Sequence, residues 1–244
     1  MNSVMSPLRA AAATTLAVTA ATATAACSGP RQPGPADCCL APGDSLSRGA
    51  RPDAAGADAG TPYGYPDIVY ARPCPGRPVL KLVQPGCPGE TTVTVIRHGT
   101  GAAPQAADLA PILSGLRAAA GAGARTAGMN CYLPGLAERR QGEPGHATAR
   151  ASVRLAAGYT CSIEGACTRA GVAVAGVSGT AGLGDPAAAP GTGTLPGNVT
   201  RTCRRIWECV HPPRGPDQHA SPAGCRVIAH AVLKAASLGV TSGR

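Results

Sequence analysis

The sequence TTVTVIRHGTG at residues 91–101 carries the strongest fold signal in this chain. Its valines and isoleucine are interleaved with threonines, and these β-branched side chains favour a short β-strand. The strand leads directly into Arg97 and His98, and Gly99 after them permits a sharp turn. Because α/β proteins place their chemistry where strands end, we expect a functional site at Arg97 and His98.

A second β-rich segment, near the C-terminus, also ends in a histidine. Residues 226–230, RVIAH, are predicted to form a strand that ends at His230, followed by a helix at 231–238. Further strands are predicted at 67–70, 79–83 and 170–176, and helices at 106–120 and 138–157. Strands that alternate with helices predict an α/β fold with a mostly parallel central sheet flanked by helices. In such a sheet His98 and His230 can meet at one edge.

The composition predicts a core of small residues that needs cross-links. Of the 244 residues, 44% are hydrophobic but only 2% are aromatic, and glycine and proline number 33 and 24. Alanine and valine each bury little apolar area, so we expect such a core to contribute little stability. None of the spacings among the 11 cysteines forms a convincing zinc-binding pair. We therefore expect disulfides formed in an oxidising compartment.

The charge of the chain is positive, at +9. A positive charge can indicate a nucleic acid, an anionic surface or an anionic substrate as partner. The arginines are scattered, without a basic run or interleaved aromatic residues. This pattern does not favour nucleic-acid binding, and no nucleic-acid partner is expected.

The first 27 residues are predicted to be an export signal. Arg9 precedes an uncharged, mildly apolar stretch at 10–26, and the segment ends in TAAC at 24–27. This ending resembles a bacterial lipobox, which implies lipidation of Cys27 and an anchor in the cell membrane, although Thr24 replaces the usual aliphatic residue. Conventional cleavage after Ala26, which would secrete the protein, is the alternative. Residues 28–66 are predicted to form a disordered tether rich in Pro, Gly and Ala, and residues 67–244 the compact domain.

Several segments together resemble the histidine phosphatase, or phosphoglycerate mutase-like, superfamily in its exported forms. They are VTVIRHG at 93–99, PGLAER at 134–139, the stretch at 159–169, LPG at 195–197 with CRRI at 203–206, and VIAH at 227–230 with the residues up to 239. The resemblance implies a three-layer sandwich around a mostly parallel sheet. It also implies a phosphatase that hydrolyses small phosphomonoesters without a metal or other cofactor.

The same resemblance implies roles for particular residues. His98 would accept the phosphoryl group as a phosphohistidine, and the phosphate would be bound by Arg97, Arg169 and His230. The family's acid is a glutamate at the position that Arg205 occupies here. Glu208, three residues further on, is the replacement that we expect to protonate the leaving oxygen.

Two other functions remain open from the sequence. GVSGT at 176–180 resembles the nucleophile elbow of a cutinase-like serine esterase, with Ser178 as nucleophile and Asp217 and His230 after it in the required order. Thr180 stands where that motif has its last glycine. The third possibility is a secreted, disulfide-stabilised binding protein that has kept an anion pocket but lost the catalytic acid.

Overall fold

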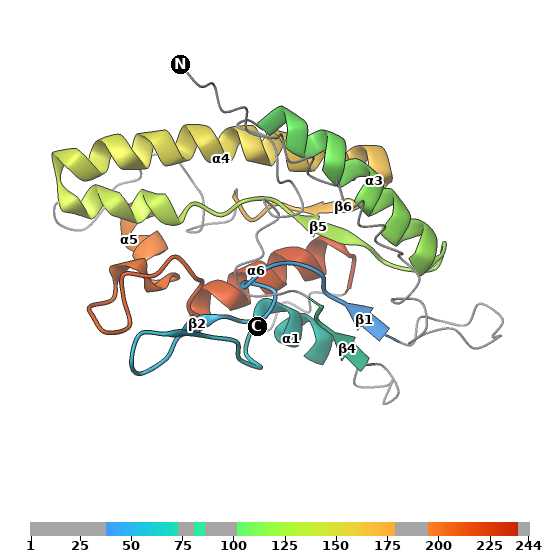
Figure 1. Cartoon of the computed structure of the whole chain (residues 1–244), viewed down its shortest axis with the longest axis horizontal. Coiled ribbons are helices and arrows are strands. Elements are labelled where there is room, and N and C mark those ends of the chain that lie inside the picture. The colour runs from blue at the N-terminus through green and yellow to red at the C-terminus, as the bar shows by residue number, and fades with distance from the viewer. Residues whose placement is uncertain (1–37, 73–80, 86–101, 179–194, 239–244) are drawn as a thin grey trace, which may run out of the picture. The chain divides into compact units, whose positions relative to one another are not determined.

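The computed structural model describes residues 38–72, 81–85, 102–178 and 195–238 (Figure 1). By its internal contacts the chain divides into Met1–Gly34 and Pro35–Arg244, and every described residue lies in the second unit. The export segment with Cys27 and the strand at 93–96 with Arg97 and His98 lie outside the described residues. The structural predictions for these segments therefore stay predictions.

The described strands are short and pair two by two. β1 (Cys38–Leu40) lies parallel to β4 (Lys81–Val83), β5 (Ala127–Met129) lies parallel to β6 (Ala173–Ala175), and β2 (Arg51–Pro52) lies antiparallel to β3 (Asp58–Ala59). The strands predicted within 79–83 and 170–176 are confirmed as β4 and β6. The parallel pairs among helices confirm the general α/β class. The described strands form three separate pairs, so a phosphoglycerate mutase-like sandwich is not confirmed.

The described helices are α1 (Tyr65–Ala71), α3 (Ala102–Ala120), η1 (Pro134–Gln141), α4 (Glu143–Ala170), α5 (Gly197–Cys203), η2 (Trp207–Cys209) and α6 (Pro222–Ala235). In Figure 1, α3 runs along α4 and α1 packs against α6. The helix predicted at 106–120 is confirmed within α3, which has Pro111 in its interior. The helical prediction for 138–157 is confirmed in η1 and α4, which are separated at Gly142, where φ is 75°.

The segment predicted to be a strand ending at His230 is helical, so that prediction was wrong. α6 begins after Ser221, whose Oγ accepts a hydrogen bond from the Gly224 N–H at 3.4 Å. Its buried residues recur at helical spacing: Gly224, Cys225, Ile228, Ala229, Ala231 and Leu233. This pattern spans the whole helix. The predicted strand at 226–230 has only two β-branched residues, Val227 and Ile228, and packing of the helix overrides their strand preference. The helix predicted from residue 231 is confirmed as far as Ala235.

The strand predicted at 67–70 was also wrong, because these residues lie in α1. The N–H of Gly64 donates a hydrogen bond to Asp67 Oδ2 at 2.9 Å, and Pro66 stands in the first turn. Both features are helix-start signals. Val69 then packs against Leu233 and Ala229 of α6.

The disordered tether predicted at 28–66 was wrong for residues 38–66, while residues 28–37 lie outside the described part. Residues 38–66 contain β1, β2, β3 and the start of α1. Leu46 and Ala50 are 6% and 3% exposed, so this segment contributes to the core despite its Pro/Gly-rich composition. A compositional argument does not detect such isolated anchoring residues.

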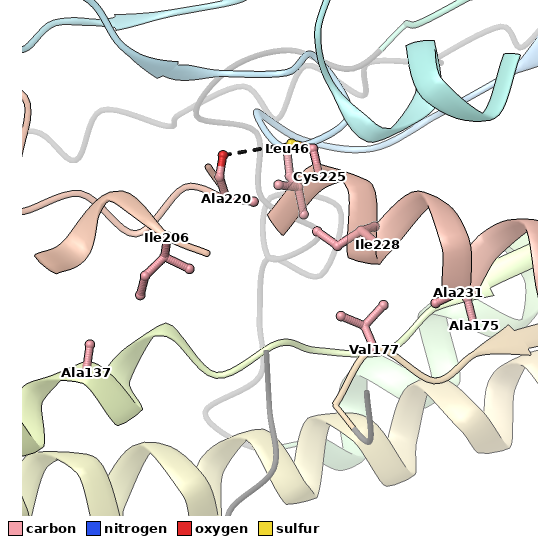
Figure 2. Packing of buried hydrophobic residues seen from close by; sticks show 9 residues of the cluster. All are labelled: Leu46, Ala137, Ala175, Val177, Ile206, Ala220, Cys225, Ile228 and Ala231. Carbon is pink, nitrogen blue, oxygen red and sulfur yellow. Dashed lines mark hydrogen bonds between the residues drawn. The ribbon is translucent and has the colours of Figure 1, made fainter. Parts of the chain in front are cut away.

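A cluster of buried apolar side chains connects distant parts of the chain (Figure 2). Its members are Leu46, Ala137, Ala175, Val177, Ile206, Ala220, Cys225, Ile228 and Ala231. Leu46 follows Ser45 in sequence, and Ala220 follows His219. Burial of one large aliphatic side chain contributes about 1.5–3 kcal/mol. The cluster therefore fixes the loop that contains Leu46 and the loop that contains Ala220, although these loops are far apart in the sequence.

One disulfide is seen among the described cysteines, and it joins Cys203 at the end of α5 to Cys209 in η2. Cys131, Cys161, Cys167 and Cys225 are not disulfide-bonded. None of the helices in the described part of the chain has the length and hydropathy that a membrane span requires.

Candidate active site

Ser45 lies on a tight turn that follows β1. The backbone N–H groups of Arg48 and Ala50 donate hydrogen bonds to the Ser45 carbonyl oxygen at 3.1 and 2.9 Å. Asp44 Oδ1 accepts from the Leu46 N–H at 2.9 Å, which closes the turn on its other side. The Ser45 side chain is partly exposed, whereas Leu46 beside it is buried. The turn thus presents the serine hydroxyl while the next residue anchors it.

This turn requires glycine at its end. Gly49 has φ of 61°, in the left-handed region. A Cβ atom there would lie 2.6 Å from both the Gly64 nitrogen and the Thr61 oxygen. The chain can therefore return toward the start of α1 only with a residue that has no side chain.

His219 connects Ser45 with Asp217 through both of its ring nitrogens. Nε2 lies 2.8 Å from Ser45 Oγ, and Nδ1 lies 3.0 and 3.1 Å from the two carboxylate oxygens of Asp217. An ionised carboxylate only accepts hydrogen bonds, so the proton of the neutral ring belongs on Nδ1. The Nε2 lone pair then faces the serine hydroxyl. This is the arrangement of nucleophile, base and orienting carboxylate in a serine hydrolase.

Backbone contacts hold the loop with Asp217 and His219 in place. Asp217 Oδ1 accepts from the His219 backbone N–H at 2.8 Å, and the Trp207 N–H donates to the His219 carbonyl at 3.0 Å. The Tyr132 hydroxyl donates to the Gln218 carbonyl at 2.7 Å. The side chains of His219 and Asp217 are 17% and 16% exposed. His219 and Asp217 are therefore held in fixed positions and largely shielded from water.

A second carboxylate, Asp58, also lies beside His219. The β2–β3 hairpin brings Asp58 Oδ1 to 3.5 Å from His219 Nδ1, with the Asp58 side chain 51% exposed. Burial raises the pKa of Asp58, and the neighbouring Asp217 carboxyl raises it further, while His219 acts in the opposite direction. The distance from Asp58 Oδ1 to His219 Nδ1 is about half an ångström longer than a normal hydrogen bond. Asp217 is therefore the closer partner of the ring.

The sequence-predicted nucleophile Ser178 lies in a different environment. Its Oγ accepts from Asn130 Nδ2 at 3.0 Å, and the same nitrogen donates to Glu164 Oε1 at 2.9 Å. Asn130 Oδ1 accepts from the N–H groups of Val177 and Ser178 at 2.7 and 3.0 Å. Among the described residues, no histidine is hydrogen-bonded to Ser178. The buried Asn130 therefore joins the ends of β5 and β6, and Ser178 has an amide rather than a base as its neighbour.

Two of the three predicted phosphate-binding residues, Arg169 and His230, lie in the described part of the chain. The family resemblance implies that Arg169 heads a helix, but Arg169 is exposed in the last turn of α4. His230 is exposed on α6. Glu208 is buried in η2. Its pKa is raised by burial first and then by the adjacent Glu138 carboxyl, against the effect of Arg140. No hydrogen bond or ion pair joins Glu208 to His230 in the described part of the chain.

A surface hollow of about 600 Å³ lies between α1 and the start of α6. Arg51, Tyr63, Arg72 and Arg226 are among its lining residues. The hollow is not lined by Ser45, Asp217 or His219. We therefore do not assign it as the pocket in which a substrate would react with these residues.

Sequence reasoning identified Asp217 but missed Ser45 and His219. The available signals were GDSLS at 43–47 directly after a short β-run, and the pair Asp217 and His219 just before the helix start at Ser221 and Pro222. The first was overlooked because its surroundings were interpreted as a tether. The second was overlooked because His230 was predicted to end a strand.

Comparisons with protein-family models, curated proteins and solved structures found no significant match for this chain. The function is therefore inferred from the geometry of the side chains around His219.

Proposed function

We propose that this protein is a serine hydrolase that cleaves carboxylic esters, with Ser45 as nucleophile, His219 as general base and Asp217 as the orienting carboxylate. The observation that carries this proposal is the continuous hydrogen-bond chain Ser45–His219–Asp217, with distances of 2.8 and 3.0 Å. The reaction class is that of the esterase alternative from the sequence, but the nucleophile is Ser45 instead of Ser178.

The geometry supports a two-step acyl transfer. Ser45 Oγ attacks the ester carbonyl while His219 Nε2 takes its proton, and the resulting imidazolium is stabilised by Asp217. His219 then gives this proton to the leaving alcohol, which leaves an acyl group on Ser45. In the second step His219 deprotonates a water molecule that attacks the acyl-enzyme, and the proton returns to Ser45 as the acid is released.

The oxyanion of each tetrahedral intermediate needs hydrogen-bond donors. Within the described part of the chain, the backbone N–H of Ser45 has no hydrogen-bond acceptor. It belongs to the nucleophile itself and is therefore available as one donor. The Asn130 side-chain amide is already engaged with Glu164 and Ser178.

The experiment compares two serine variants of the full chain with p-nitrophenyl acetate and butyrate as substrates. Ser45→Ala is expected to lower kcat by about 10⁴-fold or more, because the nucleophile is lost. Ser178→Ala is the matched control and is expected to retain turnover within about threefold of wild type, since its hydroxyl takes no part in proton transfer. A fluorophosphonate probe should label the peptide that contains Ser45. Equal turnover in Ser45→Ala and wild type, or a label on Ser178, would overturn the proposal.

The phosphatase and export hypotheses remain separate proposals. Arg97, His98 and Cys27 lie outside the described residues, so the described structure neither supports nor opposes their roles. Turnover of p-nitrophenyl phosphate that disappears in His98→Ala would favour the phosphohistidine mechanism. A lipid label that is absent in Cys27→Ser would establish the membrane anchor, and turnover of neither substrate would favour the binding protein.

A further inference from the structure

Three potential metal ligands converge at the proposed triad, and two of them, Asp217 and His219, belong to it. One carboxylate oxygen each from Asp58 and Asp217 and one ring nitrogen of His219 all lie within 4.8 Å of one another. Nδ1 of His219 faces both carboxylates, at 3.5 Å from Asp58 and 3.0 Å from Asp217. The triad is complete with Ser45 from one loop and His219 and Asp217 from another. Asp58, which the β2–β3 hairpin adds to the cluster, therefore has no explanation in the triad itself.

We infer that Asp58, Asp217 and His219 form a binding site for a divalent transition-metal ion of the Zn²⁺ type, and that the bound ion inhibits the esterase. The binding site stands on geometry alone, whereas the inhibition rests on the proposed function.

The spacing of the ligands supports this inference. Zinc binds histidine nitrogen and carboxylate oxygen at about 2.0–2.2 Å, which places neighbouring ligands of a tetrahedral site about 3.3–3.6 Å apart. The distances from Nδ1 to the two carboxylates, 3.5 and 3.0 Å, lie at or near this range. Only small side-chain adjustments are therefore needed for one ion to contact all three groups. Asp58 is 51% exposed, which leaves an entry path and a coordination position for water.

The charge of the site supports it as well. Asp58 and Asp217 place two like charges against each other, and in the described part of the chain neither forms an ion pair with a lysine or arginine. A divalent cation would neutralise both. One imidazole with carboxylates suits Zn²⁺ and related transition metals better than Mg²⁺, which prefers oxygen ligands only.

Binding of the ion would stop the general base. The metal takes the lone pair of Nδ1, and the single proton of the neutral ring moves through solvent to Nε2. Nε2–H then donates to Ser45 Oγ and cannot accept its proton. Asp217 would at the same time be withdrawn from the ring. The free and metal-bound forms therefore differ in which ring nitrogen carries the proton.

The test measures Zn²⁺ binding and ester turnover separately on the full chain. Metal-free wild type should bind Zn²⁺ in equilibrium dialysis and lose at least 90% of its p-nitrophenyl acetate turnover, with full recovery after chelation. Asp58→Asn should keep metal-free turnover within about threefold of wild type, and the Zn²⁺ concentration for half-inhibition should rise at least tenfold, because one charged ligand is lost. His230→Ala and Cys161→Ser remove an exposed imidazole and an exposed thiol elsewhere, and both should remain as sensitive as wild type.

The outcomes separate the two proposals. Unchanged Zn²⁺ sensitivity in Asp58→Asn, or loss of sensitivity in either control variant, would overturn the metal site. Absence of turnover in the metal-free wild type would overturn the esterase, while weaker Zn²⁺ binding by Asp58→Asn would still support the site. If Asp58→Asn does not fold, nitrogen NMR of the wild type decides: Zn²⁺ must shift the Nδ1 resonance of His219, and an unchanged resonance refutes the site.

Discussion

Replacing Asp217 with asparagine tests the link on which the proposed mechanism depends. Asp217 Oδ1 accepts from the His219 backbone N–H at 2.8 Å, and both carboxylate oxygens lie 3.0–3.1 Å from Nδ1. In Asp217→Asn the amide oxygen can still accept from the backbone, so its NH₂ group faces Nδ1. Because NH₂ only donates, it favours Nδ1 as an acceptor and so shifts the ring proton toward Nε2.

The expected cost follows from this exchange of tautomers. With the proton on Nε2, His219 cannot take the Ser45 proton, and the loss in kcat for this kind of change is about 10⁴-fold. This corresponds to about 5 kcal/mol of transition-state stabilisation. Asp58, 3.5 Å from Nδ1, can hold a fraction of the rings in the original tautomer and so reduces the effect. The double variant Asp58→Asn/Asp217→Asn should therefore be less active than Asp217→Asn alone.

The assay is steady-state hydrolysis of p-nitrophenyl acetate by metal-free protein, with thermal unfolding measured in parallel. The melting temperature of Asp217→Asn should stay close to that of wild type, because the two side chains have nearly the same shape. A fall in kcat of less than tenfold with the fold intact would refute the assignment of Asp217 and, with it, the triad.

Three further predictions concern stability. Ile228→Ala removes a fully buried side chain from the core and should lower the free energy of unfolding by about 2–5 kcal/mol in urea titrations; a loss below about 1 kcal/mol would contradict the packing described. Gly49→Ala should destabilise the protein by at least about 1 kcal/mol and reduce ester turnover, because Gly49 in the turn that carries Ser45 has φ of 61° and an added Cβ would meet backbone atoms at 2.6 Å. An unchanged melting temperature together with unchanged turnover would refute this. The pKa of Glu208 is raised in the folded state, so its stabilising contribution is present below the unfolded value of 4.5 and is lost as pH rises through the folded value. Glu208→Gln should therefore melt at a higher temperature than wild type at pH 7 and lose this advantage toward pH 4; a lower melting temperature at pH 7 would contradict the assignment.

Local sequence patterns were sufficient for some elements. The apolar spacing within 106–120 predicted the helix now seen in α3, and the short apolar run at 170–176 predicted β6. Gly142 separates η1 from α4. These predictions succeeded because periodicity and glycine act over a few residues, within the same element.

The sequence pattern failed where two local signals competed. Val227 and Ile228 favour a strand, but Cys225, Ile228 and Leu233 also fit one face of a helix, and the packing of α6 against α1 and the core selects the helix. The same holds for α1, where Ile68 and Val69 favour a strand but the Gly64–Asp67 hydrogen bond and packing against α6 favour a helix. Tertiary contacts decide such cases because the intrinsic preferences differ by less than the burial energy.

From its sequence alone, this chain could be assigned to the α/β class, and Asp217 could be named as a candidate member of a serine esterase triad. Its candidate site depends on a contact between His219 and Ser45, which are 174 residues apart. No local pattern specifies that contact. It forms because Leu46 and Ala220, the next residues after Ser45 and His219, are buried in the same apolar cluster, and only the folded core brings those two positions together.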